Sequence, residues 1–158
     1  MKKCCFTGHR NVDLSENLIN ITTNIIIRLI EEKGVTEYYG GGAIGWDMLC
    51  ERIILMLKQK YPFIHLHLFL PCPPENQTEF WIKEDKDLYY KILAVADSVK
   101  VISPKYYKGC MKKRNEELVN EAEYCVCYYN EKRKVNGTGQ TVRIAERKGI
   151  EIINLFKC

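Results

Sequence analysis

The chain has 158 residues, of which 46% are hydrophobic and 28% charged, and its formal net charge is +4. This balance is typical of an ordinary globular protein and argues against a disordered, collagen-like or low-complexity chain. The charge is too small to indicate a nucleic-acid or membrane-surface binder by itself. The length fits a single domain over residues 1–158.

The N-terminus lacks the apolar core of a signal peptide, and the chain has no run of 18 apolar residues. We therefore expect a cytoplasmic protein without a membrane segment. The eight cysteines are an unusual count. In a reducing compartment they are more often packed thiols than a disulfide framework. Cys72 and Cys110 lie in or beside loops at strand ends, and their role is left open.

Short apolar runs alternate with longer amphipathic patterns, which predicts an α/β fold. Strands are expected at 3–7, 36–39, 64–70, 98–102, 124–129 and 150–155, and helices at about 14–33, 46–60, 80–96, 111–122 and 140–148. Asp13 is the expected N-cap of the first helix, with Glu16 completing a capping box. The pattern predicts a doubly wound, mostly parallel Rossmann-like sheet of about six strands with helices on both faces.

The glycine-rich segment 40–47 follows a predicted strand and precedes a helix. Glycines let backbone N–H groups approach a phosphate, and the helix directs its positive end at the same point. Gly40, Gly42 and Gly45 fit G-x-G-x-x-G, but the next strand ends in Pro71-Cys72, where an NAD site has Asp or Glu. No P-loop Gly-Lys-Ser/Thr follows. A tight turn without a ligand is the alternative interpretation.

Three further segments lie at predicted carboxyl ends of strands, where ligands of such sheets bind. The segment 7–10 offers a hydroxyl, an imidazole and a guanidinium. The segment 136–141 is a second glycine turn, which could face the first across a crevice and hold the other end of a phosphate-bearing ligand. The basic and aromatic cluster contains Lys105, Tyr106, Tyr107, Lys108, Lys112, Lys113 and Arg114. It reads more simply as a solvated face, in which Arg114 and Asn115 are the better ligand candidates.

Two pairs of metal-ligand side chains occur at a spacing of two residues, His65-x-His67 and Cys125-x-Cys127. Such a pair shares one face of a strand. No C-x-x-C accompanies them, so we interpret them as core residues and expect no metal.

Taken together and in this order, the motifs resemble the SLOG superfamily and, within it, the YpsA-like family of bacterial proteins. The resemblance covers essentially the whole chain. The matching segments are Thr7-Gly8-His9-Arg10, residues 41–47, Leu70-Pro71-Cys72 with Gln77 and Trp81, residues 111–115, and residues 137–141.

The resemblance implies a Rossmann-like sheet that binds nucleotides or nucleotide-derived ligands between the two glycine turns. Relatives include the LONELY GUY phosphoribohydrolases, which cleave a nucleoside monophosphate at its N-glycosidic bond, and DprA, which binds single-stranded DNA. The phosphoribohydrolase pattern P-G-G-x-G-T-x-x-E falls here on Val135, Asn136, Gln140 and Arg143 in place of its Pro, first Gly, Thr and Glu. The catalytic carboxylate is absent from its expected place, whereas the glycines of the phosphate cradle remain.

We therefore expect a nucleotide-binding sensor or regulator that needs no metal and has a nucleotide-type ligand as its only implied cofactor. A homo-oligomer is left open, and nucleic acid is the less favoured partner. The expected ligand-binding residues are Gly8, His9, Arg10, Gly41, Gly42, Gly45, Asp47, Gln77, Trp81, Arg114, Asn115, Gly137, Thr138, Gly139, Gln140 and Thr141.

The glycine amides would hold the phosphate, and Arg10 and Arg114 would neutralise it. Asp47 would bond a ribose hydroxyl or cap its own helix, and Trp81 would stack on a base or pack in the core. One alternative is an N-glycosidic hydrolase with Asp47 or His9 as the acid–base group. Another is single-stranded DNA binding through residues 112–114, which the low net charge disfavours.

Overall fold

Six parallel strands form a single sheet in the computed structural model, which describes residues 1–120, 122–133 and 137–157. The strands are β1 (Lys2–Gly8), β2 (Val35–Gly40), β3 (His65–Leu70), β4 (Ser98–Val101), β5 (Tyr124–Tyr128) and β6 (Glu151–Asn154). Their order in the sheet is β4-β3-β2-β1-β5-β6, and every neighbouring pair is parallel. The predicted doubly wound sheet is confirmed.

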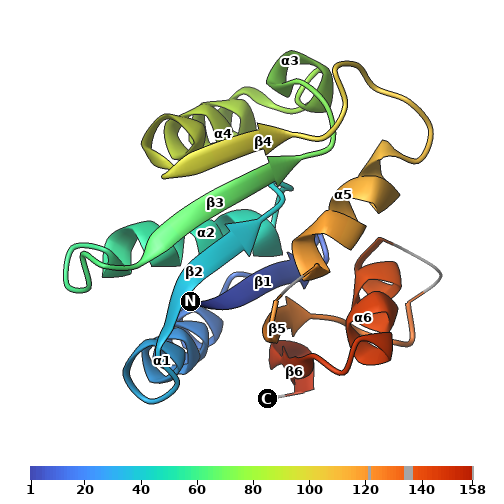
Figure 1. Ribbon diagram of the computed structural model, residues 1–158. Coiled ribbons are helices and arrows are strands. Elements are labelled where there is room, and N and C mark those ends of the chain that lie inside the picture. Colours follow the sequence, from blue (N-terminus) through green and yellow to red (C-terminus); the bar gives the residue numbers. More distant parts are fainter. Residues whose placement is uncertain (121, 134–136, 158) are drawn as a thin grey trace.

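Helices cover both faces of the sheet (Figure 1). Helices α1 (Glu16–Glu31), α2 (Trp46–Leu57) and α4 (Lys83–Val95) lie on one face, and α5 (Cys110–Val119) and α6 (Gly137–Arg147) lie on the other. The one-turn helix α3 (Pro74–Gln77) follows β3, and the 3₁₀ turn η1 (Leu155–Lys157) follows β6. The chain runs outward from β1 to β4 and then returns to add β5 and β6, so the strand order reverses between β1 and β5.

Each face of the sheet has its own apolar core. The larger core, under α1, α2 and α4, includes the fully buried side chains of Phe6, Tyr38, Trp46 and Ile54. The smaller core, under α5 and α6, is rich in cysteine and contains Cys5, Leu118, Cys125, Cys127 and Ala145. All seven cysteines that the structure describes are buried free thiols, which confirms the prediction of packed thiols for them.

The helix boundaries correct the sequence-based expectation at several points. Ser15, not Asp13, is the N-cap of α1, because its extended backbone places its Oγ 3.1 Å from the N–H of Leu18. Helix α6 begins at Gly137 rather than at Gln140, so the second glycine turn is the first turn of a helix. Helix α5 ends at Val119, and α4 begins at Lys83 after the separate turn of α3.

None of the helices in the described part of the chain is both long enough and apolar enough to span a membrane.

Candidate functional site

Two adjoining cavities lie where the carboxyl ends of the strands meet the following helices. The smaller has a volume of about 360 Å³ and the larger about 700 Å³. They share two lining residues, Arg10 after β1 and Met111 in the first turn of α5. The smaller cavity lies at the reversal of strand order between β1 and β5, where ligands of open α/β sheets bind.

The smaller cavity is built from the ends of four elements. It is lined by Thr7, Gly8, His9 and Arg10 from the end of β1, by Ala43 and Asp47 around the start of α2, by Met111, Arg114 and Asn115 of α5, and by Gly137 and Thr138 of α6. The topology therefore brings together residues that lie up to about 130 positions apart in the sequence.

Arg114 is the buried cation of this cavity, with 7% of the residue exposed. Its Nη1 donates to the carbonyl oxygen of Gly41 at 2.6 Å, and its Nε donates to Oδ1 of Asn115 at 2.9 Å. Burial lowers the pKa of Arg114, and the neighbouring acidic side chains of Asp47 and Glu51 oppose that shift. Because a guanidinium stays protonated in proteins, the wall of the cavity carries a fixed positive charge.

Two buried acids, Asp47 and Glu51, lie one turn apart on α2. Burial raises the pKa of Asp47 to about 6, against the opposing effects of Arg114 and of the N–H groups of Ala43 and Gly41, which hydrogen-bond to it. Burial and the nearby Asp47 also raise the pKa of Glu51 well above its ordinary value. Its Oε2 accepts the N–H of Gly42 at 3.0 Å, and its Oε1 has no partner among the described residues.

Several amides of the first glycine turn, those of Gly41, Gly42, Ala43 and Trp46, are therefore occupied within the protein. The N–H groups of Gly41 and Gly42 face the carboxyl groups of Asp47 and Glu51, and the N–H of Trp46 donates to the carbonyl oxygen of His9 at 3.3 Å. A phosphate could use the amides of Gly41 and Gly42 only by displacing these carboxyl groups. Their predicted role in phosphate binding stays a prediction.

His9 connects the end of β1 to the loop after β5. Its Nε2 accepts the N–H of Asn130 at 2.9 Å, so its other ring nitrogen carries the proton in the neutral imidazole. Burial lowers the pKa of His9, and Arg133 adds to the shift. The arrangement gives His9 a structural task, and its catalytic role stays a prediction.

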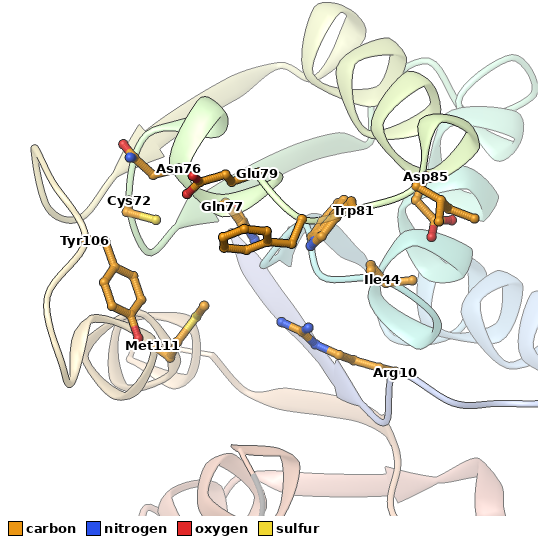
Figure 2. Close-up of a pocket in the computed structure, with 12 residues that line it drawn as sticks. Arg10, Ile44, Cys72, Asn76, Gln77, Glu79, Trp81, Asp85, Tyr106 and Met111 are labelled. Carbon is orange, nitrogen blue, oxygen red and sulfur yellow. The ribbon is translucent and has the colours of Figure 1, made fainter.

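The larger cavity continues past Arg10 toward α3 and α4, as Figure 2 shows. Its walls are formed by Arg10, Ile44, Cys72, Asn76, Gln77, Glu79, Phe80, Trp81, Ile82, Asp85, Tyr106 and Met111. Trp81 packs edge-on against Tyr89, with ring centroids 5.2 Å apart. Gln77 accepts the hydroxyl of Tyr89 at 2.9 Å and contacts the carbonyl oxygen of Gly41, so its amide is fixed in the cavity wall.

Ten of the sixteen predicted ligand-binding residues line one or both cavities: Gly8, His9, Arg10, Asp47, Gln77, Trp81, Arg114, Asn115, Gly137 and Thr138. Within the described chain, Gly41, Gly42, Gly45, Gly139, Gln140 and Thr141 lie outside both linings. Thr141 is fully buried and donates to the carbonyl oxygen of Gly137 at 2.9 Å. Arg143 is exposed on α6, and Val135 and Asn136 lie outside the described residues.

Sequence reasoning missed Glu51 and the wall of the larger cavity formed by Asn76, Glu79, Phe80, Ile82 and Asp85. Glu51 follows Asp47 by four residues, a spacing that places two side chains on one face of a helix. That spacing was a usable signal. The wall residues form no recognisable motif, because polar and apolar side chains are mixed there without a fixed spacing.

The basic cluster divides in the structure. The lysines at 105, 108, 112 and 113 are exposed, whereas Arg114 is buried against the carbonyl oxygen of Gly41. Cys72 and Cys110 are both buried and hydrogen-bonded to each other, and Cys72 reaches the larger cavity. Burial is the main cause that raises the pKa of the Cys72 thiol.

The histidine pair on β3 is not part of the core, which corrects its interpretation. The His65 side chain is 41% exposed and that of His67 18%, because both lie on a part of the sheet that the helices leave accessible. Cys125 and Cys127 are buried as expected. Over the described ranges, no group of three or more His, Cys, Asp or Glu side chains is placed to hold a metal ion.

The fold and the cleft at its switch point define a Rossmann-like α/β protein. The chain belongs to the YspA SLOG family (YpsA), whose model matches residues 4–155. UPF0398 protein BH1768 of Halalkalibacterium halodurans is 30% identical over 142 residues, which are 83% of this chain and 74% of that protein. The SPbeta prophage-derived protein YoqJ of Bacillus subtilis is 27% identical over 135 residues, 78% of this chain and 77% of its own.

Two solved structures share the fold at 16% sequence identity. DNA processing protein A (DprA) from Streptococcus pneumoniae matches with a TM-score of 0.66 over 96% of this chain, and this chain spans about half of DprA, 49% of its length. The protein TM1055 matches with a TM-score of 0.57 over 96% of this chain and 72% of its own. At this identity the likeness shows the fold alone.

Proposed function

We propose that this chain binds a nucleotide or nucleotide-derived ligand across the two adjoining cavities, with its phosphate in the smaller cavity. The observation that carries the proposal is the position of Arg10, whose exposed side chain lines both cavities and lies between them. A ligand that spans both spaces passes this guanidinium, which can bond two phosphate oxygens in parallel.

The residues that line the smaller cavity suit the phosphate end of this ligand. Arg10 and Arg114 supply positive charge at its wall, and Gly137 and Thr138 begin a helix whose N-terminal end attracts anions. Because the N–H groups of Gly41 and Gly42 in the first glycine turn are occupied, the phosphate would instead lie at the two arginines and the start of α6.

The residues that line the larger cavity suit the base of this ligand. Its volume of about 700 Å³ lies within the range of small-molecule sites, and Trp81, Phe80 and Tyr106 provide aromatic surface for stacking. Glu79 and Asp85 at the same wall offer acceptors for the exocyclic amines of a base. A sensor or regulatory role would use this ligand as its signal.

A thermal-shift panel of nucleotides tests the proposal. A ligand at 100 times its Kd adds about 2.7 kcal/mol to the free energy of unfolding. Arg10→Gln should weaken the binding of phosphorylated ligands by about tenfold or more, because it removes a charge-assisted contact. Lys112→Gln makes the same charge change at an exposed position outside both linings and should leave the shift unchanged. No shift with any nucleotide would refute the proposal.

Hydrolysis of an N-glycosidic bond is the second candidate, and Asp47 is the observation that favours it. A buried carboxyl in the smaller cavity with a pKa of about 6 can exchange a proton near neutral pH. Chromatography of nucleotides incubated with the protein would detect free base or ribose phosphate, and Asp47→Asn should abolish it. Nucleotide binding without any product would be consistent with a sensor and would refute the hydrolase hypothesis.

A further inference from the structure

A second cluster of reactive side chains lies on the sheet, away from both cavities. Ser98 begins β4, His67 lies beside it on β3, and Glu37 lies on β2. The Oγ of Ser98 is 2.6 Å from Nδ1 of His67, and Nε2 of His67 is 3.0 Å from Oε1 of Glu37. The other carboxylate oxygen, Oε2, is 3.1 Å from Nδ1 of His65. A hydroxyl, an imidazole and a carboxylate are thus connected in series.

The carboxylate determines how protons are arranged along this series. Burial acts to raise the pKa of Glu37, but the hydrogen bonds from His67 and His65 oppose it, and the pKa is lowered. An ionised carboxylate only accepts hydrogen bonds, so Nε2 of His67 must carry a proton and donate it. In the neutral ring Nδ1 then holds a lone pair, and the hydroxyl of Ser98 is the donor that faces it.

Both ends of the series are suited to reaction. The Glu37 side chain is only 7% exposed, so the group that orients the imidazole is held within the protein. Ser98 is exposed on β4, the edge strand at the opposite end of the sheet from β6 (Figure 1). Lys100 follows on the same face of β4, where its Nζ lies 5.5 Å from the ring centre of Phe69. Its Nζ also donates to Oε2 of Glu117 at 3.3 Å, so its positive charge is paired with that carboxylate.

We propose that Ser98 is an activated nucleophile that accepts the acyl group of a small activated ester. The Oγ of Ser98 forms a bond to the carbonyl carbon while its proton moves to Nδ1 of His67. The ester C–O bond then breaks, and the leaving alcohol or phenol takes that proton. Water hydrolyses the acyl-serine by the reverse proton path and releases a carboxylic acid, so the cycle needs no further reactant.

Labelling with a fluorophosphonate tests the nucleophile directly, because the reagent forms an Oγ–P bond and releases fluoride. Peptide mapping by mass spectrometry identifies the modified serine. Ser15 is the internal control, since it is also exposed but its Oγ accepts a backbone N–H from Leu18 and has no imidazole beside it. We expect Ser98 to be labelled at least about tenfold faster than Ser15 in the wild-type protein.

Variants of the protein distinguish activation of Ser98 by His67 from simple exposure of Ser98 to the reagent. Ser98→Ala should remove the adduct and the hydrolysis of p-nitrophenyl acetate, and His67→Gln should slow both by about 100-fold. Ser15→Ala should leave the Ser98 adduct unchanged. Equal labelling of Ser98 and Ser15, no adduct at Ser98, or an unchanged rate in His67→Gln would overturn the proposal. The comparison of Ser98 with Ser15 requires no variant, so it holds even where a substitution impairs folding.

Glu37 is a positioning residue in this proposal, and its effect can be measured as the position of the proton on the His67 imidazole. Nitrogen-15 NMR of the wild-type protein should show His67 with the proton on Nε2. Glu37→Gln should change that signal and slow labelling by at least about tenfold. A His67 signal with the proton on Nδ1 in the wild-type protein would contradict the proposed arrangement.

Discussion

The two glycine turns at the carboxyl end of the sheet look alike in the sequence, but Gly40 and Gly41 of the first turn and Gly137 of the second have different surroundings in the structure. In the first turn, a Cβ at Gly40 would lie 2.2 Å from Oε2 of Glu51, and one at Gly41 would lie 2.6 Å from Nη1 of Arg114. In the second, a Cβ at Gly137 would find its nearest neighbour, Nδ2 of Asn115, at 3.7 Å. The first turn is tightly packed, whereas Gly137 borders the smaller cavity.

The difference shows that glycine density by itself does not identify a phosphate site. The first turn needs glycines because buried acid and guanidinium groups approach its backbone so closely that no Cβ fits. The same acids, Asp47 and Glu51, take up the amides that would otherwise face a ligand. A glycine turn is a candidate anion site only where its N–H groups face an open space.

Gly45→Ala should produce the largest effect, because two penalties combine there. Gly45 has a φ of +85°, and its Cβ would lie 2.3 Å from the carbonyl oxygen of Arg10, a backbone atom that cannot move aside easily. We expect a loss of about 3 kcal/mol or more in the free energy of unfolding, measured by urea denaturation. Gly34→Ala is the matched control, since its φ is +68° and no atom lies within 4 Å of its Cβ.

Gly34→Ala should cost only about 1 kcal/mol, the price of the left-handed backbone alone. Equal losses in the two variants would mean that the first turn has room for a side chain, and the contrast with the second turn would be wrong.

Substitution of Glu51 should cause a smaller but still large loss of stability. Two substitutions separate its role as a hydrogen-bond acceptor from the effect of its charge. Glu51→Ala removes the acceptor of the Gly42 N–H and leaves a cavity in the core, so we expect a loss of about 3 kcal/mol. Glu51→Gln keeps an acceptor of the same size. Near pH 5 we expect it to lie within about 1 kcal/mol of the wild type, because the raised pKa keeps the acid protonated and neutral.

The pH dependence provides the second readout for Glu51. The folded protein holds this proton at pH values where the unfolded chain has released it, so the stabilisation is complete below the ordinary pKa of glutamate. It is lost as the pH rises through the raised pKa of the folded state. Denaturation at about pH 5 and about pH 8 should therefore show a larger decrease in stability for the wild type than for Glu51→Gln, in which the raised pKa of Asp47 still contributes a decrease. If wild type and Glu51→Gln lost the same stability between the two pH values, Glu51 would be ionised in the folded protein.

The fold could be predicted because it depends on patterns that repeat along the chain. Alternating strand and helix periods fix the layer order, and parallel strands bring their carboxyl ends to one edge, which is why Arg10 after β1 and Arg114 on α5 line the same cavity. Local choices were harder. Asp13 and Ser15 are both good N-cap residues, and only the path of the chain into α1 places Ser15 at that position.

The chemistry of the site was less predictable for a different physical reason. Whether the Gly42 N–H faces a ligand or the protein depends on Glu51, nine residues along the chain, and no local pattern records that choice. The sequence did not reveal the series of Ser98 on β4, His67 on β3 and Glu37 on β2 for the same reason. These residues meet only through the register of parallel strands. A motif search looks for local spacing, whereas these contacts are set by the fold.

Gly137→Ala should produce the smallest change in stability and so completes the comparison of the two turns. Gly137 is the first residue of α6, its Cβ would make only an ordinary contact at 3.7 Å, and alanine favours a helix over glycine. We expect the free energy of unfolding to stay within about 0.5 kcal/mol of the wild type in the same urea titration. A loss near that of Gly45→Ala would show that the start of α6 is packed as tightly as the first turn, and the phosphate would then have no open glycine turn to approach.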